Sequence, residues 1–197
     1  PRLTEALNLR VAAGKLSEAG REATLSRLTI ANDLTAFAPC QLVIEAIVEK
    51  VEAKRALFAA LEPLVAVDAI LATNTSSLPI HAIAEGLRNP ERVVALHFFN
   101  PPPAMKLVEL APHAATAPDA ITHAQEWTTT AGKTVILCPD RPGFIVNRCA
   151  RPYYGEALAL FSEGRSAVEI DAAMTAAGYR LGPFALILAV YFIGLVL

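Results

Sequence analysis

Short apolar runs alternate with amphipathic helical patterns along most of this chain, and this alternation limits the fold more than any other feature. The apolar runs, each suited to one strand, lie at residues 41–48, 67–77, 92–99, 105–110 and 133–138. Helical patterns lie between them at residues 49–62, 78–87 and 119–131. Strands separated by helices form βαβ units. The sequence therefore predicts an α/β fold with a largely parallel, doubly wound sheet.

The pattern changes after Cys138. The segment PDRPGF at residues 139–144 has the composition of a linker with turns. Two helical patterns follow at residues 145–162 and 167–177, and Ser166 with Glu169 forms a capping-box signature before the second. We therefore predict an α/β domain over residues 1–139 and an all-α domain that begins at residue 140 and continues to residue 197.

Composition excludes several classes of protein. The 197 residues carry 17 Lys and Arg against 19 Asp and Glu, without the basic surface that a nucleic-acid-binding protein needs. Cys40, Cys138 and Cys149 are scattered and show neither disulfide nor zinc spacing, which favours free thiols in a reducing compartment, here the cytoplasm. We predict no metal site.

The end of the chain is unusually apolar. The segment FALILAVYFIGLVL, residues 184–197, has no charge in 14 residues. A membrane-spanning helix needs roughly 20 residues, so we expect a buried helix that is cut short, or an altered reading frame, rather than a membrane anchor. At the other end, no apolar core of a signal peptide is visible.

Polar residues gather where the predicted strands end. They form three groups, at residues 45–49, 74–77 and 97–100. In open α/β sheets, ligands bind beyond the carboxyl ends of the strands. We therefore expect the three groups to meet at one edge of the sheet and to form the functional site.

His97 and Glu109 are the strongest candidates for chemistry. The strand of His97 ends before the turn Pro101–Pro103, and the next strand, which carries Glu109, can return beside it. Glu109 lies among apolar neighbours, where an unpaired carboxylate is costly, so it needs a cation. A His–Glu pair is a general-base device. The alternatives are a core histidine bonded to a backbone carbonyl and a surface glutamate.

Several other polar positions have both a structural and a functional interpretation. Ser76 or Ser77 could cap the helix that begins near Pro79, or bind a ligand. Asn100 before Pro is a common turn former. Glu49 and Lys54 could be solvated helix charges, and Asn147 could be an ordinary first-turn residue. The sequence contains no GxGxxG, Walker, HExxH or GxSxG motif.

Several motifs together resemble the 3-hydroxyacyl-CoA dehydrogenase family. They are LVIEAIVEKVEAKRALFAALE, ATNTSSLPI, RVVALHFFNPPPAMKLVEL, GKTVILCPDRPGFIVNR and GYRLGPF, from about Gly14 to Phe184. The resemblance implies NAD-dependent oxidation of (S)-3-hydroxyacyl-CoA to 3-ketoacyl-CoA, in fatty-acid β-oxidation or related acyl-CoA catabolism. It also implies a partial Rossmann-like NAD-binding domain (residues 1–139), then a truncated helical domain for substrate and dimerisation (residues 140–197).

The resemblance also implies roles for individual residues. His97 would be the general base, oriented by Glu109. Ser76 and Asn147 would bind the substrate around the reacting carbon. The positions near NAD would be Glu49, Lys54, Ser76 and Asn100. No nucleic acid or membrane partner is implied, and the parent enzyme would be a homodimer.

The sequence departs from the family at both ends. The family's first strand with GxGxxG would precede Pro1, and the helical domain is represented only by its first part. We therefore expect a fragment with the catalytic residues but half of the cofactor cradle, inactive or feebly active alone. The alternative is a degenerate, non-catalytic acyl-CoA-binding module. A β-hydroxyacid or sugar-acid dehydrogenase is a third hypothesis, against which the His97–Glu109 arrangement argues.

Overall fold

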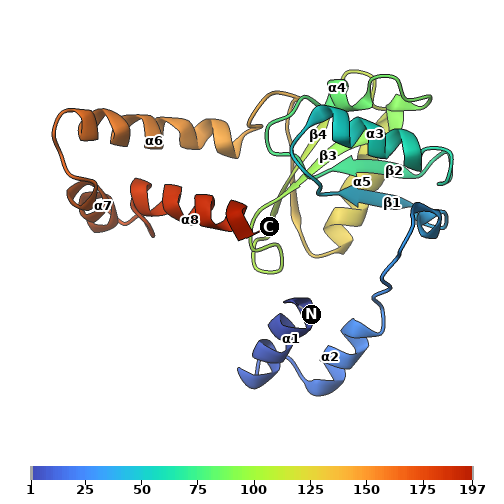
Figure 1. Cartoon of the computed structure of the whole chain (residues 1–197), viewed down its shortest axis with the longest axis horizontal. Helices are drawn as coiled ribbons and strands as arrows, with labels where there is room; N and C mark the ends of the chain where they lie inside the picture. Colours follow the sequence, from blue (N-terminus) through green and yellow to red (C-terminus); the bar gives the residue numbers. More distant parts are fainter. Residues whose placement is uncertain (1, 197) are drawn as a thin grey trace.

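The structure is a computed structural model that describes residues 2–196, with side chains described for residues 3–189. One five-stranded sheet forms its centre, with the strands side by side in chain order (Figure 1). The strands are β1 (Leu42–Glu45), β2 (Ile70–Thr73), β3 (Val93–Phe98), β4 (Leu107–Pro112) and β5 (Thr134–Leu137). All five lie within the predicted runs except at the end of β4, which continues two residues further.

The sheet is mainly parallel, as the alternation of strands and helices predicts. β1, β2 and β3 are parallel neighbours, and β4 and β5 are also parallel. Only β3 and β4 are antiparallel, because the short turn around Pro101–Pro103 leaves no room for a crossover helix. This hairpin pairs His97 directly with Glu109 in the strand register. The predicted return of the fourth strand beside the third is therefore confirmed.

Helices occur before, between and after the strands. They are α1 (Arg2–Ala12), α2 (Glu18–Leu25), α3 (Val51–Leu61), α4 (Ile80–Ala84), α5 (Pro118–Thr130), α6 (Val146–Ser162), α7 (Ala167–Ala176) and α8 (Pro183–Val196). Short 3₁₀ helices occur at Leu34–Phe37 and Pro90–Arg92. The capping box predicted at Ser166 and Glu169 is present at the start of α7.

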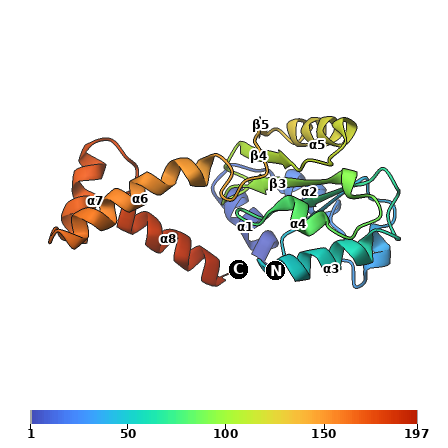
Figure 2. The ribbon, with the colours of Figure 1, turned by 90° about the horizontal axis from the view of Figure 1, so that it is seen from above.

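Helices cover both faces of the sheet, which confirms the doubly wound fold. α3 and α4 lie on one face and α5 on the other (Figure 2). Successive strand residues point to opposite faces, so Leu71 packs with Phe58 of α3 and Ile80 of α4, whereas Ala72 packs with Ala124 of α5. Two apolar clusters therefore hold the layers together, one on each side of the sheet.

Two helical parts extend from this sheet. α6, α7 and α8 form an arm in which α6 and α8 lie side by side, whereas α1 and α2 form a hairpin joined to β1 by an extended segment (Figure 1). No helix was predicted from the sequence in residues 1–40, so the hairpin of α1 and α2 was not anticipated. No helix in residues 2–196 is both long and apolar enough to cross a bilayer.

One predicted helix start was wrong. α4 begins at Ile80 without a capping serine, and Pro79 takes the position just before the first helical residue. Its first backbone N–H groups, from Ile80 and His81, instead donate to the carboxylate of Asp140 at 2.8 and 3.1 Å. The serine hydroxyls lie too early in the chain to reach those groups, and Asp140 reaches them from the distant linker.

Candidate active site

His97 and Glu109 form a buried hydrogen-bonded pair between β3 and β4. Nδ1 of His97 lies 2.7 Å from Oε2 of Glu109, whose side chain has no exposed surface. A carboxylate only accepts hydrogen bonds, so it selects the tautomer with the proton on Nδ1. Nε2 of His97 is then left as a proton acceptor. The pair predicted from the sequence therefore has the geometry of an oriented general base.

The second oxygen of Glu109 binds the start of α6. Oε1 accepts the backbone N–H groups of Ile145 and Val146 at 2.9 and 2.8 Å. The first N–H groups of a helix have no partner within the helix, and a carboxylate satisfies both their hydrogen bonding and the helix dipole. Asn147, the next residue, is thereby held close to the pair. One carboxylate thus fixes both the base and the helix that carries Asn147.

The turn before α6 directs these N–H groups at Glu109. Phe144 is buried and has φ of 40°, a left-handed conformation that is unusual for a residue with a side chain. The centre of its ring lies 5.9 Å from that of the His97 imidazole, and the ring of Phe99 lies 4.6 Å from the same imidazole. These aromatic neighbours restrict the imidazole to the orientation that the Glu109 hydrogen bond requires.

Cys138 lies in the same buried region. Its thiol is 3.6 Å from the carbonyl oxygen of Leu110, next to Glu109. Burial, together with the Glu109 carboxylate, raises the pKa of the Cys138 thiol to about 12. Cys138 therefore stays protonated and unreactive at neutral pH.

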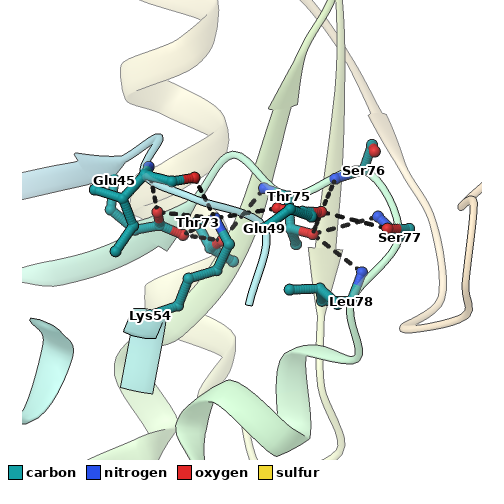
Figure 3. Close-up of polar contacts among 9 residues, drawn as sticks. Glu45, Glu49, Lys54, Thr73, Thr75, Ser76, Ser77 and Leu78 are labelled. Atoms are coloured by element: carbon teal, nitrogen blue, oxygen red, sulfur yellow. Dashed lines mark hydrogen bonds and ion pairs between the residues drawn. The ribbon is translucent and has the colours of Figure 1, made fainter. Parts of the chain in front are cut away.

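A second buried network lies at the carboxyl end of β1 and β2 (Figure 3). The ammonium of Lys54 is 2.9 Å from each carboxylate oxygen of Glu45, and both side chains are 1% exposed. Thr73 donates its hydroxyl to the same carboxylate. Since a buried charge is costly without a partner, Lys54 and Glu45 depend on each other.

Glu49 connects this network to the loop after β2. Its Oε2 lies 3.2 Å from Nζ of Lys54, and its Oε1 accepts the Thr75 hydroxyl and, at 3.3 Å, the backbone N–H of Ser76 (Figure 3). Burial raises the pKa of Glu49, but the hydrogen bond from Thr75 and the charge of Lys54 outweigh it, so the pKa lies below its ordinary value. Glu49 therefore stays ionised, with 42% of its side chain exposed.

The predicted site residues form two groups, with three further residues outside them. His97 and Glu109 form the buried pair. Glu49 and Ser76 meet at the loop after β2, and Asn74 Oδ1 links that loop to the backbone N–H of Phe98 at 2.9 Å. The remaining residues are the exposed Asn100 and Asn147 and the buried Lys54. The three polar groups predicted at the strand ends are thus brought to one edge of the sheet.

Lys54 differs most from its expected role. The sequence suggested either a solvated helix charge or a contact near the cofactor, but the side chain is buried against Glu45 and Glu49. Its position allows it to act through Glu49 rather than by direct contact. Glu45 was not predicted as the partner of Lys54, although it shows the same pattern as Glu109, a carboxylate within an apolar strand.

Comparisons with known proteins identify the family of this chain. The family model described as "3-hydroxyacyl-CoA dehydrogenase, NAD binding domain" matches residues 1–141, and the family's C-terminal domain model matches residues 143–192. A 3-hydroxyadipyl-CoA dehydrogenase of Escherichia coli is 49% identical over 182 residues, covering 91% of this chain and 38% of the relative. A 3-hydroxybutyryl-CoA dehydrogenase of Mycobacterium tuberculosis is 41% identical over 189 residues, covering 94% of this chain and 66% of the relative.

Solved structures show the same likeness. A 3-hydroxybutyryl-CoA dehydrogenase from E. coli superposes with a TM-score of 0.87 at 48% identity, over 91% of this chain and 39% of that protein. An (S)-3-hydroxybutyryl-CoA dehydrogenase from Ralstonia eutropha gives a TM-score of 0.89 at 31% identity, over 94% and 66%. The chain therefore spans between about two fifths and two thirds of these proteins. With both parts of its sequence matched by the family's models, the chain belongs to the 3-hydroxyacyl-CoA dehydrogenase family.

Proposed function

We propose that this chain carries the catalytic base of an NAD-dependent enzyme that oxidises (S)-3-hydroxyacyl-CoA to 3-ketoacyl-CoA. The observation that carries the proposal is the 2.7 Å hydrogen bond between Nδ1 of His97 and Glu109. It leaves Nε2 of His97 free to take the proton of the substrate's 3-hydroxyl group, and the Glu109 carboxylate stabilises the imidazolium that forms. Family membership supplies the substrate class.

Ser76 and Asn147 belong to two different segments, the loop after β2 and the first turn of α6. Ser76 belongs to the loop that Glu49 holds, and Asn147 belongs to the helix that Glu109 caps. We propose that both donate hydrogen bonds to the oxygen on the reacting carbon, so that the carbon is fixed while its hydroxyl proton passes to His97. Holding reacting groups in place in this way removes much of the entropic cost of the step.

The residues present fit part of a site for NAD. Glu49 is ionised and partly exposed at the carboxyl edge of the strands, where it can accept hydrogen bonds from ribose hydroxyls. Asn100 is exposed just after the end of β3. The buried ammonium of Lys54 holds the carboxylate of Glu49 in place through an ion pair. NAD, when bound, supplies the acceptor for the hydride that leaves the substrate's C3. The glycine-rich turn that holds its pyrophosphate is not in this sequence.

The same proposal covers the domains and the partners of the enzyme. We propose that residues 1–139 and 140–197 are separate domains, since the sheet ends at β5 and only helices follow. Exposed apolar side chains on α6 and α8, among them Leu158, Phe161 and Leu188, support burial against a second copy in a homodimer. Three free cysteines agree with the predicted cytoplasmic location.

The proposal is tested in two forms of the protein. The purified chain and its His97→Ala variant are titrated with (S)-3-hydroxybutyryl-CoA in a calorimeter. The N-terminal glycine-rich unit of the E. coli relative is then fused before Pro1, and NADH formation is followed by absorbance. We expect the purified chain and its His97→Ala variant both to bind the acyl-CoA. The fusion should form NADH, and His97→Ala in the fusion should lower this rate at least about 100-fold.

Three outcomes would count against the proposal or change it. Absence of acyl-CoA binding would contradict the substrate class. Turnover in the fusion that survives His97→Ala would contradict the role of His97. Binding of acyl-CoA by both chains, with no NADH from a folded fusion that binds NAD, would favour the alternative, a non-catalytic acyl-CoA-binding module.

A further inference from the structure

A cavity of about 800 Å³ lies between the turn after β3 and the helical arm. Its walls come from the turn after β3, from α6 and from the loop between α7 and α8. Its lining residues include Asn100, Met105, Cys149, Tyr153, Tyr179 and Arg180. The catalytic pair itself does not line it. The cavity is large enough for a small ligand or for part of a large one.

The chain places this cavity next to the reacting carbon. Asn100 is three residues beyond His97, and Cys149 is two residues beyond Asn147 on α6. Tyr153 lies one helical turn further along α6, about 6 Å from Cys149 at a rise of 1.5 Å per residue. A 3-hydroxyacyl group with C3 at His97 can therefore extend its distal carbons along α6 into the cavity.

The lining of the cavity is apolar and aromatic with a single charge. Among its described lining residues, Arg180 is the only Lys or Arg, and there is no Asp or Glu. No salt bridge joins Arg180 to another described residue. A guanidinium at the rim of an apolar cavity favours an anionic ligand group, above all a carboxylate that it can bind through two parallel hydrogen bonds.

The loop that carries Arg180 is held on both sides. Gly178 has φ of 99° and ends α7, and the backbone N–H of Tyr179 donates to Met174 at 3.1 Å. The ring of Tyr179 stacks on Tyr153 at 5.1 Å, and the Tyr153 hydroxyl donates to the carbonyl of Leu181 at 2.8 Å. Arg180 therefore projects from an ordered loop, which lowers the entropic cost of pairing with a ligand.

We propose that this cavity receives the distal part of the acyl group, and that Arg180 pairs with a carboxylate at its far end. The preferred substrates are then 3-hydroxyacyl-CoA thioesters of dicarboxylic acids rather than of monocarboxylic acids of equal length. This inference rests on the proposed function, and it adds the residue that distinguishes between two classes of acyl group.

The test compares adipyl-CoA, hexanoyl-CoA and free CoA, since the two acyl groups have equal length and differ only in the terminal carboxylate. Each is titrated calorimetrically into the purified chain and into Arg180→Gln, Arg180→Lys and Arg165→Gln. Arg165 is an exposed arginine in the loop before α7 and does not line the cavity, so it serves as the matched control.

We expect the chain to bind adipyl-CoA about tenfold more tightly than hexanoyl-CoA, the size of effect of one charge-assisted hydrogen-bonded pair. Arg180→Gln should bring this ratio to about one and leave the affinity for hexanoyl-CoA within about twofold. Arg180→Lys should keep part of the preference, and Arg165→Gln all of it. The preference should also weaken as salt is added, because the pair is partly exposed.

Two results would overturn the inference while leaving the proposed function intact. One is equal affinity of the unmodified chain for adipyl-CoA and hexanoyl-CoA. The other is an Arg180→Gln variant that loses affinity for free CoA and both thioesters alike, which would assign the arginine to the phosphates of CoA. Absence of binding to every thioester would instead contradict the proposed function, and this inference with it.

Discussion

Glu109, in the middle of β4, accepts the backbone N–H of Val146 at 2.8 Å and so caps the first helix of the C-terminal arm. The same carboxylate orients His97 through its other oxygen. The position of α6 and the tautomer of His97 therefore depend on one side chain. Any movement of α6 relative to the sheet would change the hydrogen bonds that set the proton on Nδ1 of His97.

The first prediction separates these two roles of Glu109. In Glu109→Gln, the N–H groups of Ile145 and Val146 require the amide oxygen, so the amide nitrogen must face His97 and donate to Nδ1. We expect His97 to change to the tautomer with its proton on Nε2, which cannot act as a base. The ¹⁵N NMR shifts of the imidazole report this change directly.

The fusion protein described above provides the matching activity test. Its turnover should fall about 10²- to 10⁴-fold in Glu109→Gln, with little loss of stability. Glu126→Gln, an exposed change on α5, is the control and should alter neither the tautomer nor the rate. An unchanged ¹⁵N spectrum of His97 in Glu109→Gln would show that the carboxylate does not set the tautomer.

The second prediction concerns the buried ammonium of Lys54. Lys54→Met leaves the carboxylate of Glu45 buried without its cation, so we expect the free energy of unfolding to fall by about 3–5 kcal/mol. Adding Glu45→Gln should recover part of this loss, because the unpaired charge is removed. Urea unfolding measures each variant. The control is Lys50→Met, since Lys50 is exposed just before α3, and its free energy of unfolding should stay within about 0.5 kcal/mol of the parent. A similarly small effect of Lys54→Met would show that the ion pair between Lys54 and Glu45 does not stabilise the fold.

The third prediction concerns stability in acid. Burial raises the pKa of Glu62, but the N–H groups of Arg88 and Asn89, each at 2.9 Å, and the charge of Arg92 outweigh it, so the pKa lies below the ordinary value of 4.5. The unfolded chain therefore takes up this proton first as the pH falls. The stabilisation is complete above pH 4.5 and is lost as the pH falls through the lower, folded pKa.

Urea unfolding at several pH values between neutral and strongly acidic conditions measures this loss. Glu62→Gln should be less stable than the parent at neutral pH, and its stability should fall less steeply in acid because it has no carboxylate to protonate. Parallel stability curves for the two proteins would show that Glu62 does not contribute to the acid dependence.

The fourth prediction compares two glycines of the helical arm. A Cβ at Gly182 would overlap both the side chain and the Cα of Asp171, so Gly182→Ala must displace Asp171. The carboxylate of Asp171 accepts the backbone N–H groups of Phe184 and Ala185 at the start of α8. We expect a loss of about 1–3 kcal/mol. Gly155→Ala, inside α6 with open space around it, should instead stabilise by up to about 1 kcal/mol.

Thermal unfolding of the two glycine variants, under identical conditions, gives their difference directly. The midpoint of Gly182→Ala should lie below that of the parent and the midpoint of Gly155→Ala at or above it. Equal midpoints for all three proteins would mean that α8 is not held against Asp171 in solution.

Local sequence patterns determined much of this protein. Apolar runs located every strand, and the alternation with helices predicted a doubly wound sheet, because hydrophobic periodicity is a property of neighbouring residues. The His97–Glu109 pair was also predictable, since a short proline turn forces two consecutive strands into a hairpin. Boundaries were less exact: the first strand was expected to span residues 41–48, but only Leu42–Glu45 pair with β2.

Only the tertiary structure decided which carboxylates hold the helices. Asp140 caps α4 across about 60 residues, and Glu109 caps α6 across more than 30. The burial of Lys54 likewise depends on Glu45, which the fold brings to it across a turn. Backbone N–H groups at a helix start can donate to any carboxylate that reaches them, so no local pattern identifies the partner. The sequence therefore determined the strands and the pairing of His97 with Glu109, whereas the packing of distant elements determined what holds that pair in place.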